Sequence, residues 1–312
     1  MATIVTLTPN PAIDVSTSVD RVVPILKLRC TPQRRDPGGG GVNVARVVRR
    51  LGGDVEAVLP VGGFTGQLLR RLLKDEGIPG RFIEAEAETR EDFSVTELTT
   101  NSQYRFVLPG ERLRESEWRE CLTTLNRSKP EPKFIVASGS LPPGAPNDFY
   151  AQAAATARKL GAKFFLDTSG APLAAALEHG VDLIKPNLRE MRDLTGAALA
   201  DEADWIAAAR KYIDAGKVAM VALSLGHLGA MFITRQQALR SPPLPVDPVS
   251  AVGAGDCFLG AIVYSLAKGD NVTDAFRLGM AAGSAALIQE GTELCRPADV
   301  YRLSAQVTIE SI

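Results

Sequence analysis

The chain has few of the residues that build metal centres, disulfide frameworks or membrane spans. Its 312 residues include only two histidines and four cysteines, and no cysteines form a Cys-x-x-Cys pair. A histidine-rich metal site is therefore not expected. The simplest prediction for Cys30, Cys121, Cys257 and Cys295 is free thiols in a reducing cytoplasm. No apolar run reaches the roughly 18 to 20 residues that a membrane-spanning helix needs.

An excess of charge of either sign is also missing. The formal net charge is −1, which argues against a nucleic-acid-binding surface. Residues 1–7 lack the basic start and the cleavage site of a signal peptide, so we expect a strand there. These features predict a cytoplasmic protein with neither a membrane nor a nucleic acid as partner. Apolar residues, in contrast, make up 45% of the chain, enough for a sizeable core.

Short apolar segments alternate with helical patterns from about residue 55 onward. The predicted strands are 2–8, 55–61, 133–138, 163–167, 181–185, 218–225 and 229–234, and the clearest helices are 67–76 and 148–160. Several strands are almost continuously apolar, as expected where helices cover both faces of a sheet. The pattern predicts an α/β fold with a doubly wound, mostly parallel sheet flanked by helices. Ligands of such folds bind beyond the carboxyl ends of the strands.

Two segments, 12–36 and 81–110, lack a helical period. The second contains a strand, a polar turn and another strand between residues 93 and 108. We expect the two segments to form a small β-sheet that acts as a lid over the strand ends. The main domain would then comprise residues 1–11, 37–80 and 111–312. An exposed face on the lid would favour a homodimer.

The segment Val252-Gly-Ala-Gly-Asp-Cys-Phe258 places two glycines and a carboxylate at the start of an expected helix. A helix start has unpaired N–H groups and a partial positive charge, and glycines let an anion approach them closely. Asp256 would repel a phosphate bound there. Its position is explained if it takes a proton from an alcohol that attacks the phosphorus. The alternative is an ordinary glycine-rich turn with Asp256 as a helix cap.

Residues 37–45, Pro-Gly-Gly-Gly-Gly-Val-Asn-Val-Ala, put four glycines before another expected helix. The dinucleotide-binding spacing Gly-x-Gly-x-x-Gly fails, because Asn43 and Val44 stand where the last glycine should be. A P-loop is absent as well. The glycines indicate close backbone approach to some other ligand, with Asn43 offering a donor and an acceptor to hydroxyl groups. The alternative is a flexible loop before a helix.

Two further segments follow predicted strands. Asn187 and Glu190 are three residues apart, so a helix would place them on one face, and their oxygens suit Mg²⁺ held largely through water. The alternative is a capping box. The segment Ser224-Leu-Gly-His-Leu-Gly229 could hold nucleotide phosphates or form a hairpin turn.

Taken in their order along the chain, these segments resemble the ribokinase-like (PfkB) family of carbohydrate kinases, and the resemblance covers essentially the whole chain. The likeness rests on Gly38 to Ala45, on Asn187-x-x-Glu190 and on Asp247 to Asp256. The opening Thr6 to Asp14 is similar to the branch that acts on sugar phosphates. Residues 27–31 and 104–107 are most similar to the minor-type 6-phosphofructokinases. The resemblance implies ATP-dependent phosphorylation of D-fructose 6-phosphate to fructose 1,6-bisphosphate, a step of glycolysis.

The resemblance also implies roles for the matching residues. Asp256 would be the catalytic base, ionised at neutral pH from its ordinary pKa of about 4. The amides of Gly253, Ala254 and Gly255 would form an anion hole. The sugar phosphate would be bound by Asp14, Lys27, Gly39, Asn43, Arg90 and Ser140, with Arg29 reaching from a partner subunit. The ATP-binding site would be lined by Lys185, Asn187, Ser224, Gly226 and Gly229.

Two cations are implied in the same way. Glu190 would organise Mg²⁺ through water. Family members often bind a monovalent cation such as K⁺ near the anion hole, and the matching stretch here holds Ser250, Val252, Ala286, Gln289 and Gly291. Glu293 adds a charge nearby whose effect on that site stays open.

Other functions remain to be weighed against this one. The nearest are a 1-phosphofructokinase and a tagatose-6-phosphate kinase. A non-catalytic sugar-phosphate sensor would need no base, so the combination of Asp256, the glycines and Glu190 argues against it. A nicotinamide dehydrogenase is disfavoured by the failed glycine spacing.

Overall fold

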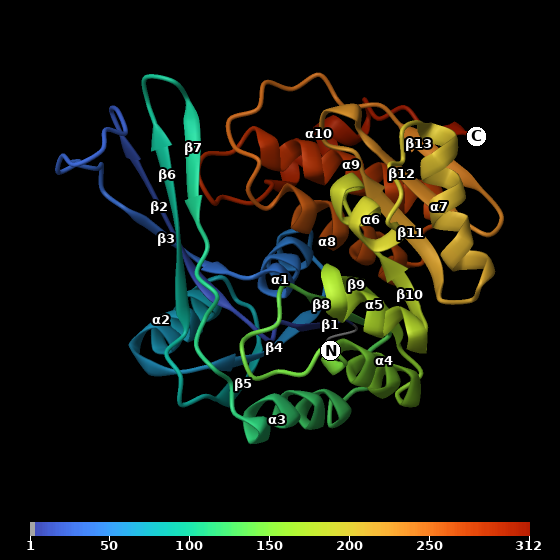
Figure 1. Ribbon diagram of the computed structural model, residues 1–312, viewed down its shortest axis with the longest axis horizontal. Coiled ribbons are helices and arrows are strands. Elements are labelled where there is room, and N and C mark those ends of the chain that lie inside the picture. The colour runs from blue at the N-terminus through green and yellow to red at the C-terminus, as the bar shows by residue number, and fades with distance from the viewer. Residues whose placement is uncertain (1–3) are drawn as a thin grey trace.

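A ten-stranded sheet runs through the middle of the protein (Figure 1). The computed structural model describes residues 4–312. In spatial order the strands are β14 (Glu310–Ser311), β13 (Ala238–Ser241), β12 (Ala230–Thr234), β11 (Val218–Ser224), β10 (Val181–Ile184), β9 (Lys163–Asp167), β8 (Phe134–Ser138), β1 (Ile4–Leu7), β4 (Val55–Val61) and β5 (Gly80–Glu84). The strands from β11 to β5 are parallel, whereas β12, β13 and β14 add antiparallel at one edge.

Helices cover both faces of this sheet, and each face has its own apolar core. The first core includes α1 (Gly40–Arg50), α2 (Gly63–Asp75), α8 (Ala254–Lys268), α9 (Val272–Leu287) and α10 (Pro297–Ser304). The second includes α3 (Glu115–Asn126), α4 (Phe149–Lys159), α5 (Gly170–His179), α6 (Leu188–Thr195) and α7 (Glu202–Asp214). Alternate residues of one strand serve opposite cores, so Val136 packs in the first and Ile135 in the second. The predicted doubly wound, mostly parallel sheet is confirmed.

Most predicted elements lie within a few residues of the observed ones. The predicted strand 2–8 is observed as Ile4–Leu7, with residues 2 and 3 outside the described part of the chain. The predicted helix 67–76 begins earlier, at Gly63. Strands β13 and β14 were not predicted, since both are short and lack a long apolar run.

A second, four-stranded sheet stands beside the carboxyl ends of the large one. Its order is β3 (Arg34–Gly38), β2 (Ala12–Val19), β6 (Arg90–Glu97) and β7 (Ser102–Phe106) (Figure 1). The small sheet is confirmed, but one expected boundary is wrong. Residues 81–84 belong to β5, which pairs with β4 in the large sheet. The division into a main domain and a moving lid stays a prediction.

The described helices and cysteines bear on two earlier expectations. None of the described helices is both long and apolar enough to cross a membrane. All four cysteines are free thiols, as predicted, and only Cys30 is exposed.

Helices α1 and α8 pack closely, and this contact places Asn43 against Asp256. Gly260 of α8 faces Val44 and Val47 of α1. A Cβ at residue 260 would lie 2.8 Å from the Val47 Cβ and 3.3 Å from the Val44 carbonyl oxygen. Only glycine allows the two helices this separation, because the Val47 Cβ is fixed to the backbone and cannot rotate away from a contact of 2.8 Å.

We expect Gly260→Ala to push the two helices apart and to lower the free energy of unfolding by roughly 1–3 kcal/mol. The matched control is Gly283→Ala on α9, where the new Cβ would meet neighbours at ordinary distances of 3.4 and 3.6 Å. The control should be as stable as the wild type or slightly more stable, because alanine is the better helix former. Urea unfolding measures both variants. Equal losses in the two would show that the α1–α8 contact is not tight.

Candidate active site

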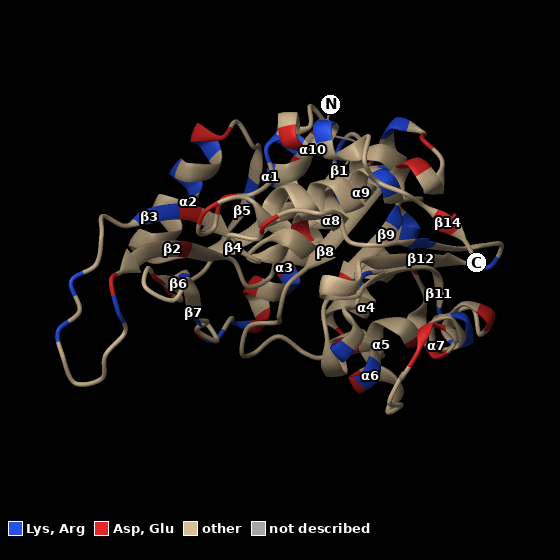
Figure 2. Cartoon of the chain, turned by 90° about the horizontal axis from the view of Figure 1, so that it is seen from above, with Lys and Arg blue, Asp and Glu red and all other residues tan. Residues whose placement is uncertain are grey.

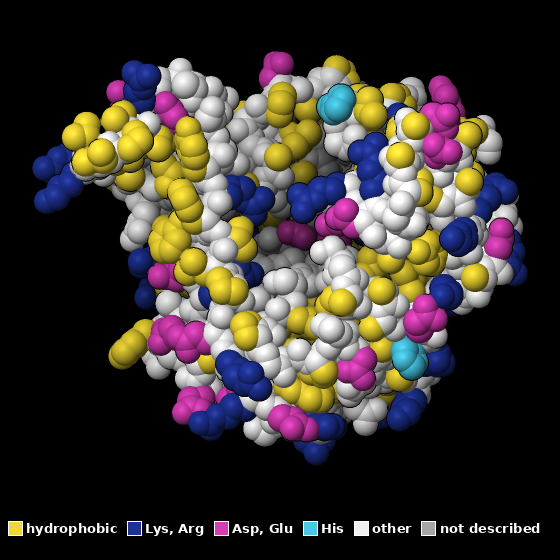
Figure 3. Space-filling model, viewed as in Figure 1, with side chains coloured by type: hydrophobic (Ala, Val, Ile, Leu, Met, Phe, Trp, Pro, Cys, Tyr) yellow, Lys and Arg dark blue, Asp and Glu magenta, His cyan; other side chains and the backbone are white. Residues whose placement is uncertain are grey.

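A hollow opens between the small sheet and the carboxyl ends of the large sheet. Figure 3 shows it with an acidic side chain at its floor and basic side chains on its walls. Ser138 ends β8 and Asp167 ends β9, while Lys185 directly follows β10. Helix α8 begins in the same region, where Lys185 approaches Gly255. The strand-end position that the fold predicts for a ligand site therefore holds polar side chains.

The start of α8 leaves its first amides free of side-chain caps. Gly253 is the N-cap residue and has a φ of 72°, in the left-handed region that glycine adopts readily. No side chain caps the helix, and Asp256 lies within the first turn. The interpretation of Asp256 as a helix cap is therefore wrong. The free amides and the helix dipole fit an anion, as the sequence predicted.

The Asp256 carboxylate is half-buried and accepts a hydrogen bond from Asn43 Nδ2 at 2.9 Å. Burial and the nearby charge of Asp167 raise its pKa to about 7, although the Asn43 hydrogen bond and the Lys185 charge oppose this. The expectation that Asp256 is fully ionised at neutral pH is thus wrong for the ligand-free protein. A pKa near the working pH suits a general base.

Lys185 brings a positive charge to the anion hole. Its ammonium lies 3.2 Å from Asp167 Oδ1, and a Cβ at Gly255 would be 3.2 Å from the Lys185 Nζ. Burial alone would lower the pKa of Lys185, but Asp167, Asp256 and Glu190 raise it above its ordinary value. The side chain therefore stays charged beside the amides of α8.

The glycine run 38–41 is packed rather than flexible, so the loop interpretation is wrong. A Cβ at Gly40 would lie 2.2 Å from Ser138 Oγ, and one at Gly38 would lie 2.4 Å from the Asp14 carboxylate. The small size of the glycines lets β2 and β8 approach the start of α1, which carries Asn43. Burial, followed by the charge of Asp92, raises the pKa of Asp14 to about 6.

Two of the residues predicted to bind the sugar's phosphate lie in one cluster. Arg90 Nη2 donates to the Asn10 carbonyl at 3.2 Å, and Asn10 Nδ2 donates to Ser140 Oγ at 3.3 Å. Arg90 Nη1 pairs with the Asp92 carboxylate at 2.6 Å. The buried Arg90 Nε has no hydrogen-bond partner.

The structure does not bring Lys27 and Arg29 to Arg90 within one chain. Both are exposed in the connection between β2 and β3, which extends away from the body (Figure 2). Ala12 pairs with Arg90, whereas the connection leaves β2 after Val19, seven residues further along the strand. At about 3.3 Å per residue, that separation is roughly 23 Å.

Besides Lys185, the four other residues predicted to line the ATP site, Asn187, Ser224, Gly226 and Gly229, lie around the ends of β10 and β11. Asn187 and Ser224 form an isolated bridge between the two chain segments. Asn187 and Glu190 form a capping box with two hydrogen bonds of 2.8 Å. Gly226 and Gly229 belong to the turn between the antiparallel strands β11 and β12. The capping-box and hairpin interpretations are both confirmed, and neither excludes a ligand at this edge.

The donor set for Mg²⁺ is sparse. Among residues 4–312, no three histidine, cysteine or acidic side chains come together as a metal cage. One oxygen of Glu190 is bound by the Asn187 amide, and Asp167 is paired with Lys185. These carboxylates fit an ion that keeps several waters and is held mainly by the phosphates of a nucleotide.

The two segments that carry the residues predicted to hold a monovalent cation pack against each other, since Ser250 N donates to the Leu287 carbonyl at 3.1 Å. Ser250 Oγ donates to the Gly291 carbonyl at 2.8 Å, and Gln289 N donates to the Ala286 carbonyl at 3.0 Å. Carbonyl and hydroxyl oxygens are suitable ligands for a hard cation. The Glu293 carboxylate forms ion pairs with Arg34 at 3.1 Å and Arg296 at 2.9 Å. Its hydrogen bond with Arg296 lowers its pKa, so its charge is already balanced by these arginines.

Sequence reasoning missed two residues that line the site, Asp167 and Asn10, and one that lies behind it, Arg46. Asp167 could have been found, because it ends a correctly predicted strand at the ligand edge. Asn10 lies just after β1, in the segment that carries the resemblance, yet nothing marked its side chain as a link to Ser140. Arg46 follows Asn43 by one helical turn and lies fully buried, a position that no local pattern distinguishes from that of the surface arginines after it.

Comparison with known proteins gives one family. The model of the pfkB family of carbohydrate kinases matches residues 8–299. An ATP-dependent 6-phosphofructokinase isozyme 2 of Mycobacterium tuberculosis is 46% identical over 299 residues, which are 96% of this chain and 88% of that protein. Phosphofructokinase-2 from Escherichia coli in complex with fructose-6-phosphate superimposes with a TM-score of 0.92 at 38% identity, covering 98% of this chain and 99% of the other.

Two other structures of the E. coli protein bear on ions and assembly. Its complex with potassium has a TM-score of 0.93 at 39% identity, over 98% of this chain and 99% of the other. Its tetrameric inhibited form has a TM-score of 0.92 at 38% identity, with the same coverage.

The raised pKa of Asp256 predicts a pH-dependent effect of Asp256→Asn on stability. The folded protein holds a proton at this position up to a pH of about 7, whereas the unfolded chain releases it near pH 4. The stability that this proton provides is therefore lost progressively as the pH rises from about 4 to about 7. Relative to wild type, the variant should gain roughly 1–3 kcal/mol in unfolding free energy between pH 5 and pH 8.5.

Urea unfolding at the two pH values measures the difference, and the exposed Asp20→Asn controls for the loss of a carboxylate as such. A difference between Asp256→Asn and wild type that stays constant with pH would contradict the assignment.

Proposed function

Because the chain belongs to the pfkB family of carbohydrate kinases, we propose that it transfers the γ-phosphoryl group of ATP to the 1-hydroxyl of D-fructose 6-phosphate. The observation that carries this proposal is a half-buried carboxylate, Asp256, in the first turn of a helix whose amides are uncapped. The names of its similar relatives in M. tuberculosis and E. coli support the choice of sugar phosphate.

Asp256 accepts the proton of the attacking hydroxyl. With a pKa of about 7 it is already half in its basic form at neutral pH. Binding of the sugar brings the hydroxyl to the carboxylate and excludes water from the hollow. The amides of residues 253–256 and the charged Lys185 stabilise the negative charge of the transferring phosphoryl group. No protein nucleophile is needed for this in-line transfer.

The sugar phosphate lies between the lid and the start of α1. Asp14 and Asn43 bind its hydroxyl groups, and the Gly39 backbone lies alongside. Arg90 and Ser140 bind its phosphate. Lys27 and Arg29 act from the lid of a partner subunit, because within one chain they are far from this cluster.

ATP occupies the edge formed by Lys185, Asn187, Ser224, Gly226 and Gly229. Mg²⁺, bound near Glu190 through water, would neutralise charge on the nucleotide phosphates. A monovalent cation among Ser250, Val252, Ala286, Gln289 and Gly291 would fix the loop before α8. The potassium complex of the E. coli relative supports this choice of ion.

We expect ATP-dependent ADP release with Mg²⁺ to be fastest, by kcat/KM, with fructose 6-phosphate. Fructose 1-phosphate and tagatose 6-phosphate are the competing substrates, and the assay is run with and without K⁺. Asp256→Asn should lower kcat by about 10²–10⁴-fold while KM changes little, because the base acts only in the transition state. Sugar-phosphate binding without any turnover by the wild type would favour the sensor instead.

The lid also supports self-association. Phe93 of β6 is paired with Phe106 of β7, and Val95 with Tyr104, so alternate residues put all four on one face. Phe106 is 57% exposed and Phe93 39% exposed, and apolar side chains gather over this part of the molecule in Figure 3. We propose that a second copy of the chain covers this face and forms a homodimer.

Phe106→Glu should convert the dimer to a monomer, because it places a charge in the middle of the apolar face. Phe64→Glu on α2 is the matched control, since Phe64 is 85% exposed but lies outside the lid. Light scattering coupled to size exclusion measures both masses. A wild-type monomer, or the same mass for both variants, would remove the lid from the interface.

A further inference from the structure

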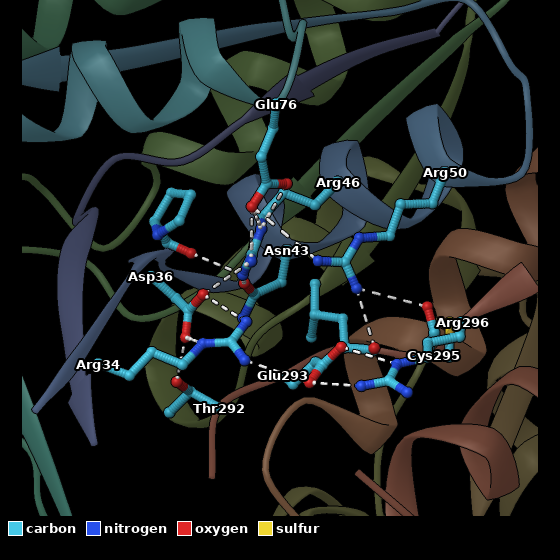
Figure 4. Close-up of polar contacts among 12 residues, drawn as sticks. Arg34, Asp36, Asn43, Arg46, Arg50, Glu76, Thr292, Glu293, Cys295 and Arg296 are labelled. Atoms are coloured by element: carbon cyan, nitrogen blue, oxygen red, sulfur yellow. Dashed lines mark hydrogen bonds and ion pairs between the residues drawn. The ribbon is translucent and has the colours of Figure 1, made fainter. Parts of the chain in front are cut away.

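Arg46 is the largest fully buried side chain of the described residues, and it is charged. Figure 4 shows its guanidinium between Glu76, Asn43 and Asp36. It donates to Glu76 Oε1 at 2.8 Å, to the Pro37 carbonyl at 2.9 Å and to Asn43 Oδ1 at 3.3 Å. A buried guanidinium is costly unless its donors are used, and here they are distributed over several elements.

The contact with Asn43 determines how that amide is turned. A side-chain amide has an acceptor at one end and a donor at the other, and a guanidinium can only donate. Arg46 therefore requires Oδ1 on its own side, which turns Nδ2 toward Asp256. In the reversed amide, the NH₂ group would face the guanidinium and the oxygen would face the Asp256 carboxylate. Both contacts would be unfavourable.

We propose that Arg46 is a positioning residue for the catalytic base, acting through the Asn43 amide to hold Asp256 in its proton-accepting form. The inference rests on the proposed function, in which Asp256 is that base. Arg46 touches neither the carboxylate nor the hollow. Its effect passes through two hydrogen bonds, Arg46 to Asn43 and Asn43 to Asp256.

The charged groups around Asp256 give the direction of the effect. Asp167 from β9 and Asp14 from β2 raise the pKa of Asp256, as burial does, while Lys185 and the Asn43 hydrogen bond lower it. When Arg46 is changed, the amide can turn and this hydrogen bond is lost. The pKa of Asp256 then rises, and the base is ionised only at higher pH.

Arg50 provides a matched control on the same helix. It lies 4.0 Å from the same Glu76 carboxylate and donates to the Leu294 carbonyl at 2.9 Å, but the contacts of its side chain do not include Asn43. An effect of losing an arginine beside Glu76 would appear in both variants. An effect that passes through Asn43 would appear only at Arg46.

The test is a double-mutant cycle of Arg46→Lys and Asn43→Ala. Lysine keeps the charge beside Glu76, but its single nitrogen lacks the fork that reaches Glu76 and Asn43 together. Each single change should move the acid limb of the kcat–pH profile to higher pH by about 0.7 unit. This is roughly the pKa change expected when a carboxylate loses one hydrogen bond. The double variant should shift no further than Asn43→Ala alone, and Arg50→Lys should not shift the profile.

A second readout does not depend on turnover. A ¹³C NMR titration of the Asp256 carboxyl carbon, assigned by its absence in Asp256→Asn, should show the same upward shift in Arg46→Lys without substrates. If the wild type phosphorylates no sugar, the proposed function fails while this titration still tests Arg46. Arg46→Met, which removes every donor, should shift the titration at least as far.

Additive shifts in the double variant would overturn the inference, because Arg46 would then act by another route. A folded Arg46→Lys protein with an unshifted carboxyl titration would overturn it as well. A lower melting temperature with an unchanged titration would indicate a purely structural arginine.

Discussion

A carboxylate and an anion-binding helix start share the first turn of α8, and the rest of the site depends on how their repulsion is balanced. Asp256 stands beside the amides that would receive a phosphoryl group. Burial and Asp167 favour its protonated form, whereas Asn43 and Lys185 favour the ionised one. Because burial and Asp167 prevail and bring the pKa to about 7, small displacements of α1 relative to α8 change the fraction of ionised base at neutral pH.

The two sheets contribute different parts of the same reaction site. Asp14 comes from the small sheet and Asp256 from the body, so the proposed sugar contacts and base meet only when the sheets are aligned. Thr292 Oγ1 donates to Asp36 of β3 at 2.7 Å, and Gln103 of β7 lies 3.3 Å from Ser250. These bonds join the small sheet to the loop before α8 and to the loop between α9 and α10. The small sheet is therefore tied by side-chain contacts to the segments in which the cation site and the anion hole are proposed.

Sequence patterns predicted what repeats along the chain and missed what depends on packing between distant segments. Continuous apolar runs identified the buried parallel strands, and the glycine spacing before Asp256 identified a helix start that no side chain caps. Residues 81–84 were misplaced because an edge strand looks the same whichever sheet it joins. Arg46 had no signal, since its burial depends on Glu76 and Pro37 closing around it. Lys27 matched the family motif, but the motif does not tell how far the loop that carries Lys27 extends from the body. That distance is set by the folded structure.

The energetics of the site also separate an enzyme from a sensor. A protein that only binds a sugar phosphate would be more stable with an amide at position 256, because a half-buried carboxylate beside Asp167 costs stability at neutral pH. An acid with a pKa near neutral pH at this position fits a group that takes up and releases a proton during a reaction. Asn43 and Lys185 reduce the cost without removing it, since a base with its ordinary pKa of about 4 would accept an alcohol proton less readily. A basicity near neutral pH is therefore the property that this arrangement of buried groups provides.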